Sequence, residues 1–513
     1  MRRIFSIILT LALALSLGTA ALAAGNFLDL TDGTVYEVTE HLHLNRLTID
    51  ETSSLTAPAG SVPVVTVDGY LKTIEPGTAY AFYGNVEVYP LSGAVVGENI
   101  RGASAVYADG GAKISLANQT YLSYGHLDGE YADGEWVSDA SNEYGSKFGM
   151  SAGILANGAG TALTLDTVTV LSASGSTSNG VFAANGADIT VKDSTVITNN
   201  SQGHGLDATF GGFFHVENSV LRTNGGASSV LSTDFGGGYF EVENTYCESN
   251  TTGSGAVYAA GSSIFVIKDS TLHANKSEAV MNAHNNSIVV LKDCLVHGPE
   301  IFDGHQAMPS PENAFGDNTF SFNCRFEAVD NAVIHEQGGV TTHYIVGCDT
   351  SACSADYAIQ VEYENGMGAG KVYVHLWDTE LTGDIYCFEG GVVELNLYDG
   401  AVFTGEVIKD GECDVTINVY DGGVYNGEYD ANIIPESVPA PVYADNTYGS
   451  AEWIMNESGL WAAGNSWTSY ENTYDTYVQP VIAAASSVVN GKENTPTVVL
   501  ASGEPSENPP GVF

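Results

Sequence analysis

Four polar residues recur at one position of a repeated pattern and could together bind a metal ion or a polar substrate. They are Glu248, His273, His297 and Glu327, and each lies four positions after an Asp or Asn of a turn-like motif. If successive copies stack as β-strands about 5 Å apart, the imidazoles and carboxylates would reach one Zn²⁺ or Ca²⁺ ion. The same column is also typical of a solvated polar face whose alternating charges avoid repulsion, so both interpretations stay open.

A second group could perform acid and base catalysis. Asp207 lies two residues into one copy of the pattern, and Asp234 and His284 each lie four residues into later copies. Two carboxylates on adjacent copies would approach the separation that glycosidases use. Polar turn residues produce the same pattern, and the offset of two positions leaves the distance between the carboxylates open.

A third group could bind sugars. Three aromatic residues each directly precede an Asp, at nearly equal intervals along the chain: Trp377 with Asp378, Tyr398 with Asp399, and Tyr420 with Asp421. Stacked rings beside carboxylates suit the apolar faces and the hydroxyl groups of a sugar. Such rings are as often internal packing, so their exposure decides between ligand binding and a structural role.

All three groups depend on a repeat with a period of about 25 residues. Its turn positions hold Asp193, Asn218, Asn244, Asp269 and Asp293, which recur at an almost constant interval. Asp and Asn tolerate a left-handed backbone, which indicates a recurring turn. Apolar residues lie two and four positions before each turn and charged residues lie directly before it, a period of two that predicts short strands with one buried face. The repeat therefore predicts an all-β parallel solenoid, in which Lys192 lies beside Glu217 on the next coil.

Charge and a targeting signal restrict the function. The chain has 16 Lys and Arg against 62 Asp and Glu, a net charge of −46. This charge argues against nucleic acid and acidic polysaccharides and favours neutral carbohydrate or a cell-surface or matrix component as the partner. Arg2 and Arg3 precede an apolar run, which predicts a secretory signal peptide and an extracellular protein. We expect no membrane span, because no later apolar run reaches about 20 residues, and we expect a monomer.

Seven Cys allow at most three disulfides. Cys294, Cys324 and Cys348 share one inward position of the repeat, which favours buried thiols in the reduced form. A local loop closed between Cys348 and Cys353 is the alternative.

Changes in the pattern along the chain define its expected organisation. The expected segments are a signal peptide at 1–24, an N-terminal cap with irregular first coils at 25–122, an acidic insertion loop at 123–150, the solenoid at 151–430 with an inserted loop at 299–318, C-terminal coils or a cap at 431–489, and a disordered tail at 490–513. The acidic insertion is a further candidate for Ca²⁺, although it lacks the spacing of an EF-hand loop. Coils beyond the inserted loop are shorter than those before it, so the cross-section narrows.

Several segments resemble a known family of secreted proteins. They include "ADITVKDSTVITNN" at 187–200, "SIFVIKDSTLHAN" at 263–275 and "INVYDGGVYNG" at 417–427. These units are similar to adhesin-like right-handed parallel β-helix proteins of anaerobic bacteria, which share the fold of pectate lyases. The resemblance implies a right-handed single-stranded β-helix with coils of about 22–25 residues, and it implies no particular reaction. Gly203-His204-Gly205 also matches one motif of polygalacturonase-like hydrolases, but the carboxylate motifs of those enzymes are missing from the sequence.

Three functions remain after these observations. The leading hypothesis is a secreted surface or adhesin-like protein that binds carbohydrate or a host or matrix surface without catalysis. The alternative is a polysaccharide hydrolase or lyase of the β-helix class. A purely structural rod is the third.

Overall fold

The computed structural model describes residues 27–497 with gaps, of which the longer ones are 58–63, 71–80, 126–139, 306–315 and 444–478. The chain divides into two compact units, Met1–Ala94 and Val95–Phe513. In the described part of the first unit, a five-stranded sheet has the order β1 (Phe27–Leu30), β3 (Leu42–Ile49), β5 (Val64–Tyr70), β7 (Val86–Pro90) and β6 (Ala81–Tyr83). Two short strands, β2 (Val35–Glu37) and β4 (Ser54–Thr56), pair beside a separate core around Leu47 and Val65.

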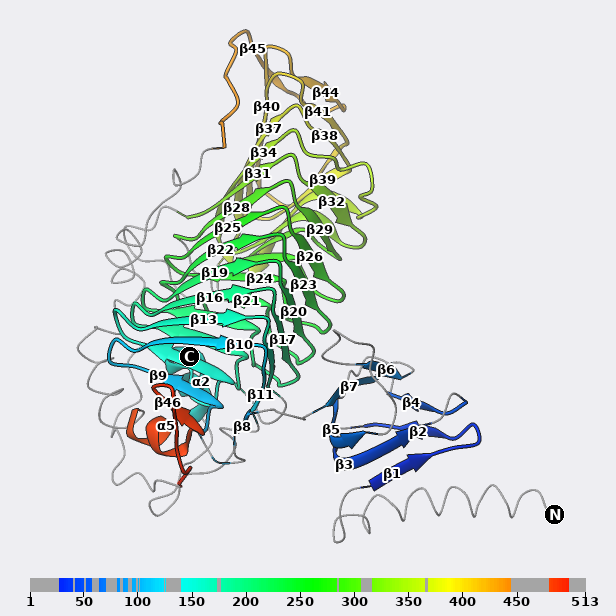
Figure 1. The fold of residues 1–513 in the computed structure, drawn as a ribbon. Helices are drawn as coiled ribbons and strands as arrows, with labels where there is room; N and C mark the ends of the chain where they lie inside the picture. The colour runs from blue at the N-terminus through cyan, green and yellow to red at the C-terminus, as the bar shows by residue number, and fades with distance from the viewer. Residues whose placement is uncertain are drawn as a thin grey trace, which may run out of the picture. The chain divides into compact units, whose positions relative to one another are not determined.

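Three long parallel sheets make up most of the described second unit, and successive coils contribute neighbouring strands to each (Figure 1). Sheet 1 has 13 strands: β10 (Lys113–Ala117), β13 (Ala162–Asp166), β16 (Asp188–Lys192), β19 (Phe213–Glu217), β22 (Tyr239–Glu243), β25 (Ile264–Lys268), β28 (Ile288–Lys292), β31 (Asp317–Phe322), β34 (Val340–Val346), β37 (Lys371–Trp377), β40 (Val392–Leu397), β43 (Asp414–Tyr420) and β45 (Asn432–Ile434). Sheet 2 has nine strands: β8 (Val95–Gly97), β11 (Thr120–Ser123), β14 (Thr169–Ser172), β17 (Thr195–Thr198), β20 (Val220–Thr223), β23 (Tyr246–Ser249), β26 (Thr271–Ala274), β29 (Leu295–Gly298) and β32 (Arg325–Ala328).

Sheet 3 has 15 strands and carries the residues that matter most below. They are β9 (Val106–Ala108), β12 (Ile154–Asn157), β15 (Val181–Ala184), β18 (Leu206–Thr209), β21 (Leu231–Ser232), β24 (Val257–Ala260), β27 (Val280–Ala283), β30 (Phe302–His305), β33 (Ala332–Gln337), β35 (Tyr357–Glu364), β36 (Gly368–Ala369), β39 (Asp384–Phe388), β42 (Val407–Asp410), β46 (Val488–Val489) and β47 (Lys492–Glu493). The narrow last coils add a small sheet of β38 (Glu380–Thr382), β41 (Val402–Thr404) and β44 (Val424–Asn426). The expected all-β parallel solenoid is confirmed.

The repeated turn lies where the sequence predicts it. Each of the five turn residues has a positive φ, between 47° at Asp193 and 53° at Asp293. The strands before the turns pair in register, so that Lys192 lies opposite Glu217, with a distance of 3.5 Å between Nζ and Oε2. The turns therefore stack at one corner, as the repeat requires.

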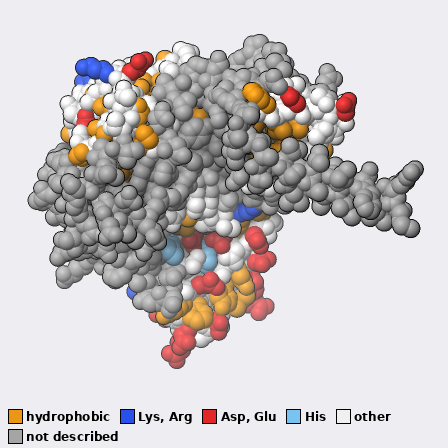
Figure 2. All heavy atoms as spheres, turned by 90° about the horizontal axis from the view of Figure 1, so that it is seen from below, with side chains coloured by type: hydrophobic (Ala, Val, Ile, Leu, Met, Phe, Trp, Pro, Cys, Tyr) orange, Lys and Arg blue, Asp and Glu red, His pale blue; other side chains and the backbone are white. Residues whose placement is uncertain are grey.

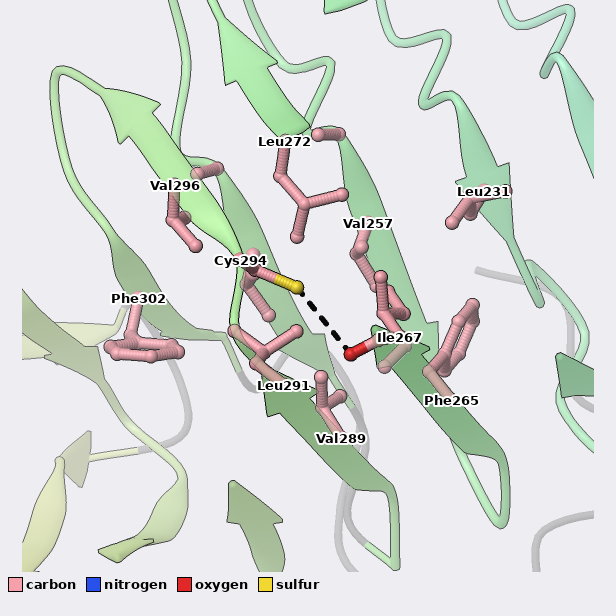
Figure 3. Close-up of a cluster of buried hydrophobic side chains, with 14 of the residues drawn as sticks. Leu231, Val257, Phe265, Ile267, Leu272, Val289, Leu291, Cys294, Val296 and Phe302 are labelled. Carbon is pink, nitrogen blue, oxygen red and sulfur yellow. Dashed lines mark hydrogen bonds between the residues drawn. The ribbon is translucent and has the colours of Figure 1, made fainter. Parts of the chain in front are cut away.

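The interior is a continuous stack of equivalent side chains. The rings of Phe214, Phe240 and Phe265 are fully buried and stack at centroid distances of 5.1 and 4.7 Å. Figure 3 shows Cys294 among buried side chains that include Ile267 and Leu291, with its Sγ donating to the carbonyl oxygen of Ile267 at 3.4 Å. The hydrogen bond with Cys324, together with burial, raises the pKa of the Cys294 thiol far above its ordinary value, as expected for a reduced core thiol. All seven Cys are free thiols, so no disulfide joins Cys348 to Cys353.

Two expected segments differ from the structure. The segment at 25–122, expected to hold a cap and irregular first coils, contains the first strands of the three long sheets from β8 on. The expected acidic loop at 123–150 ends in a helix, α2 (Ala140–Phe148), because Tyr144 and Phe148 form an apolar face four residues apart that packs on sheet 3. Within the expected loop at 299–318, residues Phe302–His305 form β30, because Phe302 continues the buried column of sheet 3.

The described residues 479–497 pack beside β9, whereas β45, also within the expected segment 431–489, is the last strand of sheet 1. Strand β46 pairs in parallel with β9, and helix α5 (Gln479–Ala485) buries Val481 and Ile482 against Tyr107 and Phe148. In Figure 1, α5 and β46 lie beside β9, at the opposite end of the unit from β45. The described residues 490–497 are therefore ordered rather than part of a disordered tail, while 498–513 lie outside the described residues.

Candidate functional site

The outer face of sheet 3 carries one side chain per coil in a continuous column. In strand register the column reads Tyr107, Leu155, Phe182, Asp207, Ser232, Tyr258, Met281, Asp303, His335, Gln360, Tyr386 and Ile408. Its first members are apolar and are covered by α2 and α5. The later members include ionisable and aromatic side chains, so this face is where chemistry concentrates.

Four ionisable side chains converge on strands β30, β33 and β35, and we name them the Glu300 cluster: Glu300, Asp303, His335 and Glu362. Nδ1 of His335 lies 3.1 Å from Oε2 of Glu300 and 3.5 Å from Oδ1 of Asp303. Nε2 of the same ring lies 3.2 Å from Oε2 of Glu362. One imidazole is thus surrounded by three carboxylates. Figure 2 shows histidine side chains among acidic ones on the described part of the surface.

Burial and charge shift the pKa values within this cluster in a defined direction. Asp303 is almost fully buried, and this desolvation raises the pKa of its carboxyl. Burial alone would lower the pKa of His335, but its hydrogen bond to Glu300 and the charges of the three carboxylates outweigh burial and raise it. The ring is therefore a cation at neutral pH in the metal-free protein.

Two pairs of aromatic rings lie next to this cluster on β35 and β39. We name Tyr357, Tyr363, Tyr386 and Phe388 the aromatic patch. Tyr357 and Tyr386 have centroids 5.5 Å apart, and Tyr363 and Phe388 have centroids 6.4 Å apart. Tyr363 is 51% exposed and the other three rings are half-buried. The hydroxyl of Tyr386 donates to Oδ2 of Asp410 at 3.0 Å, so the patch combines exposed rings with fixed acceptors.

A second cluster lies nearer the start of sheet 3 and contains two expected catalytic candidates. The backbone N–H of Asp234 donates to Oδ1 of Asp207 at 3.4 Å. Nε2 of His204 lies 3.9 Å from Oδ2 of Asp234, and Nδ1 accepts the backbone N–H of Ser229 at 3.0 Å. The third expected candidate, His284, lies outside the described residues. His204 thus occupies the place beside the two carboxylates.

Asp207 is unsuited to contact a substrate. Its side chain is fully buried, and burial raises its pKa to about 8, so at neutral pH it is mainly protonated. Burial lowers the pKa of His204, but the hydrogen bond to Asp234 and the charge of Asp207 outweigh it and leave that pKa raised. His204 and Asp207 are thus buried polar groups. Of the two carboxylates, only that of Asp234 is partly exposed.

Comparison with known proteins bears on the fold. Residues 152–320 match the family model described as "Right handed beta helix region". The fold is a right-handed parallel β-helix. No curated protein and no solved structure matches the chain. Among the described residues, no helix of the β-helix protein is long and apolar enough to cross a membrane.

The four residues of the metal site predicted from the repeat are neighbours on adjacent strands, as the sequence predicts. Glu248, His273, His297 and Glu327 occupy adjacent strands of sheet 2, and the two imidazole rings stack at 4.3 Å. Other groups already hold the carboxylates. Nε of Arg222 lies 2.7 Å from Glu248, and Arg325 lies 2.9 Å from Glu327.

A group of side chains close enough together to ligate one metal ion lies on sheet 3. Within the described part of the chain, the group of three ligand atoms lying within 4.8 Å of one another is formed by Glu300, Asp303 and His335. In the sequence, Asp303 belongs to the inserted loop predicted at 299–318, and the repeat register assigns it no position.

The expected sugar-binding strip is a stack in which Trp377 and Tyr398 are buried and Tyr420 is half-buried. Trp377 and Tyr398 stack at 4.1 Å, and Tyr398 and Tyr420 lie 4.5 Å apart, as the spacing predicts. However, Trp377 is 5% and Tyr398 is 6% exposed, and the indole N–H of Trp377 donates to the carbonyl oxygen of Val438 at 2.9 Å. The burial of Trp377 and Tyr398 argues against a sugar contact through these two rings, and the chain at Val438 contacts Trp377. The adjacent carboxylates of Asp378, Asp399 and Asp421 lie exposed at the corner.

Proposed function

We propose that the protein is an extracellular β-helix that binds neutral carbohydrate on a cell or matrix surface through the aromatic patch, without catalysis. This proposal rests on the four rings of the aromatic patch. They form two partly exposed pairs on β35 and β39, beside the carboxylates of Glu362 and Asp410. Rings offer an apolar face to a sugar, and fixed carboxylates accept its hydroxyl hydrogens.

The charge of the chain supports a neutral ligand. With 62 acidic against 16 basic residues, the protein repels uronic and sialylated glycans. The rigid stack of coils supports a binding role, because it holds the ring pairs on strands rather than on loops. The expected signal peptide supports an extracellular location.

The pairing of nearby carboxylates supports the absence of catalysis. Glu362 is bound to His335, and Asp207 is buried and mainly protonated at neutral pH. A hydrolase needs one accessible acid and one accessible base flanking the scissile bond. The second candidate function, a glycoside hydrolase, is favoured only by the contact between Asp207 and Asp234.

A glycan array followed by titration of each retained glycan tests the proposal. The double variant Tyr363→Ala and Tyr386→Ala should weaken binding by about 5- to 160-fold, because each ring contributes about 0.5–1.5 kcal/mol. The matched control is Tyr246→Ala, which removes a tyrosine that is 36% exposed on sheet 2 and should leave affinity unchanged.

Two results would contradict this proposal. Unchanged affinity in the folded double variant would exclude the aromatic patch as the binding site. Release of reducing sugar by the wild type, abolished in Asp234→Asn, would establish the hydrolase instead.

A further inference from the structure

The Glu300 cluster has the dimensions of a metal site. The three atoms that could ligate are Nδ1 of His335, Oε2 of Glu300 and Oδ1 of Asp303, and the imidazole nitrogen lies 3.1 and 3.5 Å from the two oxygens. In a tetrahedral zinc site with bonds of about 2.05 Å, neighbouring ligand atoms are separated by about 3.3 Å. The two separations bracket this value, and all three ligand atoms lie within 4.8 Å of one another, which is the spacing of a group that could hold one ion.

Each of these three side chains also has a partner that orients it. Glu362 lies 3.2 Å from Nε2 of His335 and holds the ring so that Nδ1 faces Glu300 and Asp303, and an ion bound by Nδ1 would displace the proton from that nitrogen. Asn331 donates to Oε1 of Glu300 at 2.6 Å, and Gln337 donates to Oδ1 of Asp303 at 3.1 Å. Carboxylates and amides that orient the ligands in this way are a regular part of metal sites.

A separate observation concerns a buried polar side chain on the next strand of this face. Gln360 follows His335 in the outward column and is 6% exposed. Its Oε1 is buried without a hydrogen-bond partner among the described residues. A buried amide oxygen without a partner costs about 1–3 kcal/mol. Gln360 is therefore a polar group of this face that the side chains of the described residues leave unsatisfied, one strand beyond His335.

We propose that Glu300, Asp303 and His335 bind one divalent transition-metal ion, with Zn²⁺ as the best fit. The imidazole ligand decides the class of ion, because Ca²⁺ and Mg²⁺ prefer oxygen ligands alone whereas Zn²⁺ accepts one nitrogen with carboxylates. This site is separate from the sheet 2 column around His297, and it does not depend on the proposed carbohydrate binding.

The competing arrangement is a metal-free ion-pair network in which the His335 imidazolium bridges Glu300 and Glu362. The two arrangements differ in a measurable way, since only the first binds an added ion. We would express the full chain without a polyhistidine tag, remove metal with a chelator and titrate it with Zn²⁺ by calorimetry. Metal content after dialysis would be measured by mass spectrometry.

We expect one Zn²⁺ per chain, and binding at least about 100-fold weaker in Asp303→Asn and in Glu300→Gln. The control variant His297→Gln removes a histidine from the sheet 2 column and should bind Zn²⁺ as the wild type does. Zn²⁺ should also raise the melting temperature of the wild type but not of Asp303→Asn. This second measurement shows directly whether a variant is folded.

Three outcomes would overturn the proposal. They are no Zn²⁺ bound to the folded wild type, equal binding by Asp303→Asn, and loss of binding in His297→Gln with retention in Asp303→Asn. Tighter binding of Ca²⁺ than of Zn²⁺ would overturn the class of ion.

Discussion

Replacing Asp207 by Asn should change how the stability of the protein depends on pH. Asp207 is fully buried, and burial raises its pKa from 3.8 to about 8. Between these two values the unfolded chain releases the proton of this carboxyl while the folded chain keeps it. The folded state therefore loses stability as pH rises through this window. Asn has nearly the same shape and no proton to release, so the variant lacks this loss.

The size of the effect follows from the width of the window. One pKa unit corresponds to about 1.4 kcal/mol, so Asp207 alone contributes a slope of about −1.4 kcal/mol per pH unit between about pH 4 and pH 8. Over the whole window the sum reaches about 6 kcal/mol, as an upper value. The Asp207→Asn variant should therefore match the wild type near pH 4 and exceed its stability near pH 8.

Urea unfolding followed by circular dichroism at about pH 5 and about pH 7.5 measures this difference. His204 titrates in both proteins, so the difference between the two pH profiles is the quantity to compare. The control is Asp193→Asn, which removes a carboxylate from an exposed turn of the preceding coil and should keep the wild-type profile. Parallel profiles for Asp207→Asn and the wild type would refute the reasoning, because they would mean that Asp207 ionises alike in both states.

Two further predictions concern packing. Phe240→Ala should lower the free energy of unfolding by about 3–5 kcal/mol in urea titrations, because it opens a cavity between the rings of Phe214 and Phe265; a loss below about 1 kcal/mol would contradict the continuous core. Trp377→Phe should cost about 1 kcal/mol by removing the hydrogen bond to Val438, and limited proteolysis should then cut the chain around Val438 faster. An unchanged cleavage rate would show that this bond does not hold the segment.

The repeat made much of the fold predictable. In a parallel stack with in-register strands, residues that are one period apart are spatial neighbours, so counting from the turns places Lys192 beside Glu217 and His273 beside His297. The same counting predicted the stacking of Trp377 on Tyr398. These successes share one cause, which is a constant coil length within each stretch.

The Glu300 cluster could not be found in this way, because coil length changes there. In the outward column Met281 is followed by Asp303 and then by His335, and the second interval along the chain is much longer than the first. An insertion of variable length breaks the count, and no local pattern in the sequence replaces it. The burial of Trp377 was equally hidden, since it depends on a distant part of the chain near Val438.

The pairing of β46 with β9 has a consequence for how the protein is made. Ser104 and Ser486, whose backbone N–H and hydroxyl oxygen are hydrogen-bonded across this contact, are 382 residues apart, so β9 is synthesised long before its partner. Until then β9 is an open strand edge, and the apolar rings of Tyr107 and Phe182 lack the cover of α5. A chain cut short before residue 479 exposes that surface and is a target for aggregation or quality-control proteases, so only completed chains have a closed first coil.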